Sequence, residues 1–538
     1  MGRFLKIGND GFRAVLNGEY VDKSELIEIV NATLNTERQF TCVSRARRFG
    51  KSIGAKMLYA YYDQWCASED LFTGLKIYQS PAFRRHFRRY PVLYLDMTDF
   101  VSRYISSDIV AHIQSDVMAE LKEVYPDVPY RDNYDLADTL FAITSQPYQE
   151  KFIVIIDEWD AILREYSGSG DVSEQYLNML RGLFKSANAM STFAGVYMTG
   201  ILPIKKYKTQ SALNNFHEYS IVQPGPMAEC FGFTAEEVKG LCAKYDMDYC
   251  TIAEWYDGYQ IGGSKAMFNP TSVMTAIYNK YCDSYWANTA AYDTVAVYIR
   301  MNFDGLKDDV VRLLAGESCP VDTVSFQNDL NVVRSKDDVL TLLIHLGYLT
   351  YDRDSGTCRI PNREIANEFK NAVVLETGWD VIANAIKQSD QLIKDTLAGK
   401  EEAVAAAIDA IHADNTSVLK YNDENSLACV LTIAYFTAKK DYLMIRELPT
   451  GKGFADIALL PRPNCKKPAV VLELKYNQSA ETAITQIHEK RYAGALKDYA
   501  GEVVLVGIDY DKGTKTHSCM IEKINNCYFL FLHKEAMH

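Results

Sequence analysis

The chain has 538 residues, 48% hydrophobic and 24% charged, which is the composition of a globular protein of several domains. Its formal charge of −13 argues against a chain that coats nucleic acid over its whole surface, although a local basic groove stays compatible with it. Twelve cysteines without a C-x-x-C pair argue against a zinc ribbon or a disulfide framework, and no apolar run reaches the length of a membrane span. We therefore expect a cytoplasmic protein with reduced thiols and no membrane segment.

The first motif along the chain lies at residues 44–52, after a short apolar strand and before a helix predicted from Ile53 to Tyr62. It matches the phosphate-binding pattern G-x-x-x-x-G-K-[ST], except that Arg45 stands at the first glycine. In such loops backbone N–H groups and the lysine bind phosphates, and the hydroxyl holds Mg²⁺. The nucleotide-binding candidates are Gly50, Lys51 and Ser52, with Ser52 also a metal ligand, and the neighbouring Arg47 and Arg48. A solvated basic turn is the alternative.

Three further apolar segments, residues 90–97, 152–158 and 191–200, alternate with helical patterns and predict a doubly wound parallel sheet. Ligands bind at the carboxyl ends of the strands in such sheets. We expect Asp157 to hold Mg²⁺, Glu158 to orient or deprotonate the attacking water, and Thr199 to lie near the γ-phosphate. The alternative is an ordinary strand followed by an acidic helix start.

Two flanking segments are open to two interpretations. The amphipathic stretch 25–34 either packs near the base of a nucleotide or caps the domain. A basic helix around residues 84–89, with four arginines, either meets phosphate or is a solvated face, which is the commoner case.

The middle of the chain is mainly helical. Thr234 and Glu237 have the spacing of a capping box at a helix start. A helix over 337–347 followed by two short strands predicts a winged-helix-like module, of a kind that binds DNA or serves as a lid on ATPases. Residues 371–413 are helical again and resemble a connector with one packed face.

A second constellation lies near the C-terminus. Glu473 and Lys475 are two residues apart on a predicted strand and therefore share one face, while Asp456 heads the neighbouring strand. Two carboxylates suit a hard divalent cation, and the lysine could orient or activate the attacking water. Glu424 is a further candidate ligand and Glu447 a weaker one, and Gln486, Lys490 and Tyr492 follow on a helix. A structural Glu–Lys pair at a sheet edge is the alternative.

These motifs resemble two known families. The loop 47–52, the Asp157-Glu158 strand and residues 199–204 are similar to the AAA-ATPase-like domain of many bacterial proteins. The Asp456…Glu473-x-Lys475 pattern resembles the PD-(D/E)XK nuclease superfamily. We accordingly predict an AAA-ATPase-like P-loop domain over 1–225, a helical and winged-helix-like region over 226–375, a helical connector over 376–415 and a nuclease-like α/β domain over 416–538.

The resemblance implies binding and hydrolysis of ATP with Mg²⁺, and metal-dependent cleavage of nucleic acid, with DNA the expected polymer. The expected catalytic residues are Glu158, Asp456, Glu473 and Lys475, and the expected metal ligands are Ser52, Asp157, Asp456, Glu473 and Glu424. A nucleotide-switched regulatory protein with an inactive nuclease fold is the alternative, and a transcription regulator that uses residues 320–370 is a third. The sequence leaves a homo-oligomer open.

Overall fold

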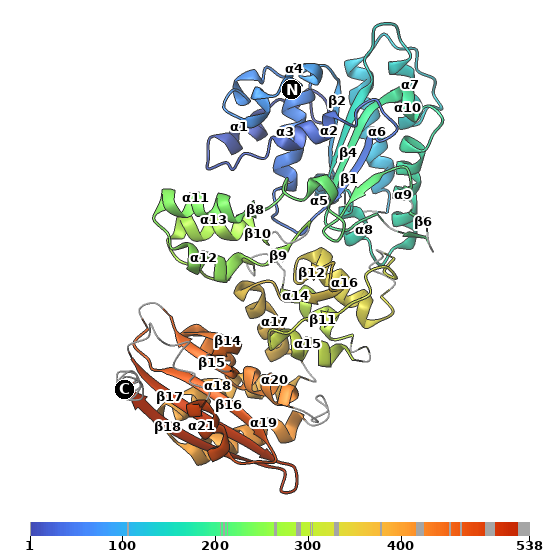
Figure 1. The fold of residues 1–538 in the computed structure, drawn as a ribbon. Coiled ribbons are helices and arrows are strands. Elements are labelled where there is room, and N and C mark those ends of the chain that lie inside the picture. Colours follow the sequence, from blue (N-terminus) through green and yellow to red (C-terminus); the bar gives the residue numbers. More distant parts are fainter. Residues whose placement is uncertain are drawn as a thin grey trace. The chain divides into compact units, whose positions relative to one another are not determined.

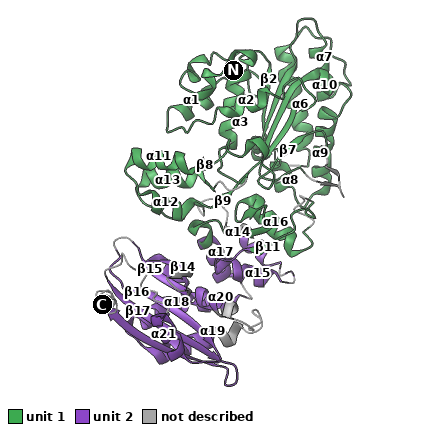
Figure 2. Cartoon of the chain, in the orientation of Figure 1, with its two compact units in different colours: residues 1–289, 319–366 green, residues 290–318, 367–538 purple. Residues whose placement is uncertain are grey.

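The computed structural model describes residues 2–104, 107–204, 206–207, 210–211, 213–262, 266–286, 292–301, 303, 305–327, 333–376, 379–415, 424–450, 453–462, 465–489 and 501–525. The chain divides into two compact units (Figure 2). Unit 1 comprises residues 1–289 and 319–366, and unit 2 comprises residues 290–318 and 367–538. Each unit combines two segments of the chain, and the units divide within the middle region. The four predicted domains remain a prediction.

A five-stranded parallel sheet forms the centre of unit 1 (Figure 1). Its order is β2-β3-β4-β1-β7, with the bounds β1 Phe40–Ser44, β2 Val92–Asp96, β3 Phe152–Asp157, β4 Phe193–Gly200 and β7 His217–Tyr219. Every residue of β1, β3 and β4 is buried, because helices cover both faces of the sheet. The predicted doubly wound α/β domain is confirmed.

The helices of this domain lie on both sides of the sheet (Figure 1). They are α1 Asp10–Leu16, α2 Glu25–Asn31, α3 Lys51–Tyr62, α4 Phe83–His86, α5 Met97–Arg103, α6 Ile109–Val124, α7 Leu136–Thr144, α8 Ala161–Glu165, α9 Gly170–Phe184 and α10 Ala189–Thr192. The apolar faces of α6, α7 and α9 share one core with the strands, and α3 lies on the opposite face. The short strands β5 Lys206–Tyr207 and β6 Gln210–Ser211 form a separate hairpin.

The predicted basic helix is a single turn. Of its four arginines only Arg84 and Arg85 lie in α4, since the helix ends at His86 and Arg88 has a left-handed φ of +54°. Arg84 forms an ion pair with Glu69. These residues therefore do not present one continuous basic helix face.

A small helical module follows the sheet. It contains α11 Ala235–Tyr245, α12 Tyr249–Tyr256 and α13 Pro270–Asn279, together with the strands β8 Phe233–Thr234, β9 Tyr259–Gln260 and β10 Ala266–Phe268. The predicted capping box is present, because the side chains of Thr234 and Glu237 each accept a hydrogen bond from the other residue's backbone N–H. The module has its own apolar core.

The predicted helix and hairpin of the winged-helix-like module are also present in unit 1. Helix α16 Lys336–Leu346 ends at Gly347. Strand β13 Thr357–Arg359 pairs with β12 Thr350–Asp352 on one side and with the additional strand β11 Cys319–Pro320 on the other. Gly347 has a φ of +88°, the left-handed conformation that glycine adopts at helix ends.

Unit 2 holds the second sheet, in the order β14-β15-β16-β17-β18. Its strands are β14 Tyr442–Thr450, β15 Gly453–Pro461, β16 Ala469–Tyr476, β17 Glu502–Asp511 and β18 Thr516–Asn525, and only β16 and β17 run parallel. Helix α21 Ala480–Glu489 packs on one face. The other helices of this unit are α14 Tyr292–Ile299, α15 Leu306–Leu314, α17 Arg363–Leu375, which begins in unit 1, α18 Asp380–Ala398, α19 Glu401–Asn415 and α20 Glu424–Ala434. No helix within the described ranges is long and apolar enough to cross a membrane.

Candidate functional sites

The predicted phosphate site lies at the carboxyl edge of the parallel sheet. Strand pairing sets Asp96 beside Asp157 and Val43 beside Thr199, so the ends of β1, β2, β3 and β4 meet there. The glycine at the end of the loop, Gly50, has a φ of +90° and immediately precedes α3, which begins at Lys51. A helix start of this kind offers backbone N–H groups to an anion.

Lys51 is almost completely buried, and its ammonium group has three partners. Its Nζ donates hydrogen bonds of 3.1 Å to the carbonyls of Arg45 and Ala46 and lies 3.5 Å from Glu158 Oε1. The lysine therefore rests against its own loop and against the carboxylate that we predicted to act on water. A bound triphosphate would have to replace these contacts.

Asp157 sits deeper in the site, at the end of β3. Burial raises the pKa of Asp157 to about 6, and the nearby Ser52 hydroxyl acts against that shift. The Tyr94 hydroxyl donates to Asp157 Oδ2 at 3.2 Å. A buried carboxylate beside a hydroxyl at a helix start is a donor set that suits Mg²⁺.

Thr199 is fully buried, and its hydroxyl has no hydrogen-bond partner among the described residues. Its backbone carbonyl accepts from Trp159 N at 2.9 Å, which ties the end of β4 to the turn after β3. The structure thus places the predicted γ-phosphate residue at the shared strand edge, with a hydroxyl that no atom of the described ranges satisfies.

The three arginines of the loop have different environments. Arg45 is completely buried, and its guanidinium donates to the carbonyls of Ser44, Tyr219 and Met227 at 2.8, 2.8 and 3.0 Å. It therefore braces the loop instead of facing phosphate. Arg48 donates to the carbonyl of Tyr285 at 2.8 Å, whereas Arg47 is exposed.

Residues of the helical module donate hydrogen bonds to three consecutive backbone carbonyls of the phosphate loop. Arg47 O accepts from Asn269 Nδ2, Arg48 O accepts from the Thr271 hydroxyl, and Phe49 O accepts from the Gly232 N–H. On another side, a Cβ added to Gly347 would lie 2.5 Å from the Ala46 side chain. The helical and winged-helix-like modules are thus both in contact with the phosphate loop.

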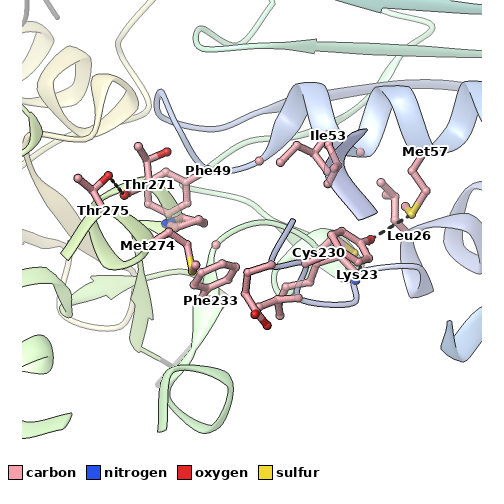
Figure 3. Close-up of a pocket in the computed structure, with 18 of the residues that line it drawn as sticks. Lys23, Leu26, Phe49, Ile53, Met57, Cys230, Phe233, Thr271, Met274 and Thr275 are labelled. Carbon is pink, nitrogen blue, oxygen red and sulfur yellow. Dashed lines mark hydrogen bonds between the residues drawn. The ribbon is translucent and has the colours of Figure 1, made fainter. Parts of the chain in front are cut away.

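A mostly apolar cavity of about 280 Å³ opens beside the loop (Figure 3). One wall comes from the N-terminal segment and α2, including Tyr20 and Leu26, and another from α3, including Ile53 and Met57. The helical module closes it with side chains such as Phe233, Met274 and Thr275. Of residues 25–34, Leu26 lines this cavity, whose apolar character would suit a nucleotide base, and the placement of this segment near a base stays a prediction.

The second site lies on the face of the unit 2 sheet that α21 covers. In the antiparallel register of β15 and β16, Ile457 pairs with Leu472, so the next position along sets Asp456 opposite Glu473. The Oδ2 atom of Asp456 accepts a hydrogen bond of 2.7 Å from the Leu474 N–H. Glu473 Oε1 lies 3.3 Å from Lys475 Nζ and also accepts from the Gln486 side chain on α21. The structure therefore brings Asp456, Glu473, Lys475 and Gln486 together.

This site is strongly enclosed, because Glu473 is 1% exposed and Lys475 7%. The buried Glu473 and the partly buried Asp456, on neighbouring strands, form a donor set that fits one hard divalent cation. Within the described residues, no group of three or more metal-binding side chains occurs. The side chains of Glu424 and Glu447, and residues Lys490 and Tyr492, lie outside the described residues.

Comparison with family models gives two matches. Residues 6–209 match the model described as predicted AAA-ATPase, and residues 422–519 match the PD-(D/E)XK nuclease superfamily. The chain joins an AAA-ATPase-like domain to a PD-(D/E)XK nuclease superfamily domain. Both resemblances drawn from the motifs are confirmed.

Two solved structures show a remote similarity to the chain. AMPPCP-bound DnaA from Aquifex aeolicus is 10% identical, with coverage of 67% of this chain and 88% of that chain and a TM-score of 0.24. Cdc6p from Pyrobaculum aerophilum is 9% identical, with coverage of 69% and 98% and a TM-score of 0.25. Similarity at this level carries no argument about function. No curated protein matches the chain.

Two charged residues next to Glu158, Arg164 and Asp160, were not predicted from the motifs. Arg164, on α8, contacts both Glu158 and Asp160, and Asp160 is fully buried. Their i,i+4 spacing after the Asp157-Glu158 pair was visible in the sequence. Such pairs are common on solvated helices, so the spacing alone does not identify a site.

Proposed function

We propose that the chain binds and hydrolyses ATP with Mg²⁺ and that this reaction controls a metal-dependent cleavage of nucleic acid. The observation that carries the first half is the convergence of Lys51, Ser52, Asp157 and Glu158 at one sheet edge beside an apolar cavity. The second half rests on the cluster of Asp456, Glu473 and Lys475 in unit 2.

In the ATPase site each residue has a defined task. The apolar cavity takes the base, while Lys51 leaves its loop carbonyls and Glu158 to neutralise the β- and γ-phosphates. Ser52 and Asp157 would hold Mg²⁺, which supplies charge neutralisation on the phosphates when bound. Glu158, released by Lys51, positions the attacking water, and the unsatisfied Thr199 hydroxyl donates toward the γ-phosphate.

In the nuclease-superfamily domain, Asp456 and Glu473 would hold the divalent cation, which supplies Lewis-acid stabilisation of charge on the scissile phosphate when bound. Lys475 orients the attacking water from the same strand face as Glu473. Gln486 holds the Glu473 carboxylate in place from α21. Burial of Glu473 and Lys475 strengthens their electrostatic interactions relative to water.

The test uses the full chain with plasmid, linear and single-stranded DNA and with RNA, in Mg²⁺ or Mn²⁺. We expect cleavage of at least one polymer, and we expect the Glu473→Ala variant to lose it while still binding that polymer. A Lys51→Ala variant should lose ATP binding at least tenfold. Equal cleavage by wild type and Glu473→Ala would contradict the nuclease assignment, and unchanged ATP affinity in Lys51→Ala would contradict the ATPase assignment.

A second candidate is a nucleotide-switched regulatory protein whose nuclease fold only binds nucleic acid. The contact of three successive loop carbonyls and Ala46 with the middle modules favours it, because nucleotide binding at the loop would then be felt by those modules. Tight ATP binding with negligible turnover, and nucleic acid binding without cleavage, would support this candidate.

A further inference from the structure

Four charged side chains form an unbroken chain of ion pairs across the ATPase-like site. Lys51 Nζ lies 3.5 Å from Glu158 Oε1, and the other oxygen of that carboxylate lies 2.9 Å from Arg164 Nη2. Arg164 Nε lies 3.1 Å from Asp160 Oδ2. The two cations and two anions alternate, so the row is electrically neutral as it stands.

The far end of this chain is fixed to the backbone. Asp160 is completely buried and accepts from the N–H groups of Ile201 and Leu202 at 3.2 and 2.9 Å. Trp159 adds two bonds to the same turn, through its N–H to Thr199 O and through its indole to Leu202 O. Asp160 therefore has a fixed position, and Arg164, which pairs with both carboxylates, fixes the position of Glu158 relative to it.

Nucleotide binding would change the charge balance among these four side chains. If Lys51 moves to the phosphates, Glu158 keeps one cationic partner, Arg164, beside an incoming polyanion. Without Arg164, the Glu158 carboxylate would hold Lys51 more firmly and would repel the triphosphate. Both effects act in the same direction, against binding.

We propose that Arg164 is a positioning residue that shares the Glu158 carboxylate with Lys51, and thereby frees Lys51 for the phosphates while keeping Glu158 aimed at the site. Arg164 acts through Glu158 and not through a contact of its own with nucleotide. A bidentate guanidinium suits this task, since one side chain must hold two carboxylates at once. The inference rests on the proposed nucleotide binding.

The test is a double-mutant cycle on the affinity for Mg²⁺ and the non-hydrolysable analogue AMPPCP, measured by calorimetry on the full chain. We expect Arg164→Ala to weaken binding about tenfold in the wild-type background, and by less than twofold in the Glu158→Gln background, where no charge is left to compensate. Arg164→Lys should give an intermediate loss, because an ammonium replaces the charge but not the two-sided geometry.

Arg103→Ala is the matched control. Arg103 pairs with Asp99 four residues earlier on α5, which is the same helical spacing as Asp160 and Arg164, but the pair is partly exposed. This variant should bind like wild type. Far-ultraviolet circular dichroism and the thermal midpoint would check that each variant folds, and Arg164→Lys would carry the test if Arg164→Ala does not fold.

The outcomes distinguish a wrong role for Arg164 from an absence of nucleotide binding. An equal loss on Arg164→Ala in both backgrounds would mean that the guanidinium meets the nucleotide directly and would overturn the positioning role. No loss in either background would overturn it as well. If wild type binds no AMPPCP and no ATP, the nucleotide-binding proposal itself fails, and the inference fails with it.

Discussion

At the residue scale, the AAA-ATPase-like domain buries several charged side chains in and around its candidate site. Arg45, Lys51, Asp157 and Asp160 are all nearly or fully buried. A buried charge is costly unless charged partners or hydrogen bonds compensate it. Lys51 and Asp160 have charged partners in the chain of ion pairs, and the guanidinium of Arg45 donates to three carbonyls. Such compensated buried charges are common at functional sites.

Asp63 offers a test of such burial away from the phosphate site. It caps the C-terminal end of α3 and is fully buried, and burial raises its pKa from 3.8 to about 6. Between these values the unfolded chain releases a proton that the folded chain keeps, so stability falls as the pH rises from about 4 to about 6 and stays lower above it.

We therefore expect Asp63→Asn to raise the free energy of unfolding by about 1–2 kcal/mol at pH 8, and to make little difference near pH 4. Thermal melts at both pH values would measure it. The exposed Asp127→Asn serves as a control without a pH-dependent effect. A lower midpoint for Asp63→Asn at pH 8 would show that the carboxylate's hydrogen bonds outweigh its desolvation.

At the element scale, most strands and helices were predictable from local patterns. Continuous apolar runs identified β1 to β4, and the Thr234 capping box identified the start of α11. The structure differs where long-range contacts decide. The basic segment ends after one turn, and the role of Arg45 depends on carbonyls at Tyr219 and Met227, about 180 positions away in the sequence. No local pattern contains that information.

The end of α16 lies against the phosphate loop, which allows a prediction at this scale. In Gly347→Ala the new Cβ would lie 2.5 Å from the Ala46 Cβ and 3.1 Å from Trp286, and the residue has a φ of +88°. We expect the displaced loop to lose at least tenfold in ATP affinity, measured by equilibrium binding.

The matched control is Gly356→Ala, in the turn after β12. This glycine also has a positive φ, +65°, but no atom lies within 4 Å of the added Cβ. Its substitution should cost about 1–2 kcal/mol of stability from backbone strain alone and leave ATP affinity unchanged. Equal affinities for the two alanine variants would show that contact between α16 and the loop does not matter for binding.

At the scale of the whole molecule, the two sites lie in different compact units, Lys51 in unit 1 and Glu473 in unit 2. The motifs predicted both candidate sites, because each strand end or loop carries a short recognisable pattern of its own. The proposed coupling between them would be a property of the whole chain, which no single motif describes.

Coupling predicts a specific behaviour of the Lys51→Ala variant. We expect ATP to change the rate of nucleic acid cleavage by wild type several-fold, and to leave the rate of Lys51→Ala unchanged at its basal, metal-dependent value. Initial rates with and without ATP would measure this, with Glu473→Ala as the blank. An ATP effect that persists in Lys51→Ala would place the effector site elsewhere in the chain.

The buried guanidinium of Arg45 determines what would happen if this residue were replaced by glycine. Burial lowers its pKa to about 10, so it remains charged at neutral pH, and three carbonyls depend on it. Restoring the usual glycine would leave Ser44, Tyr219 and Met227 without their donor and open a void in the core. Changing Arg45 to the glycine of the general phosphate-loop pattern would therefore destabilise this protein, because the arginine holds the loop in place.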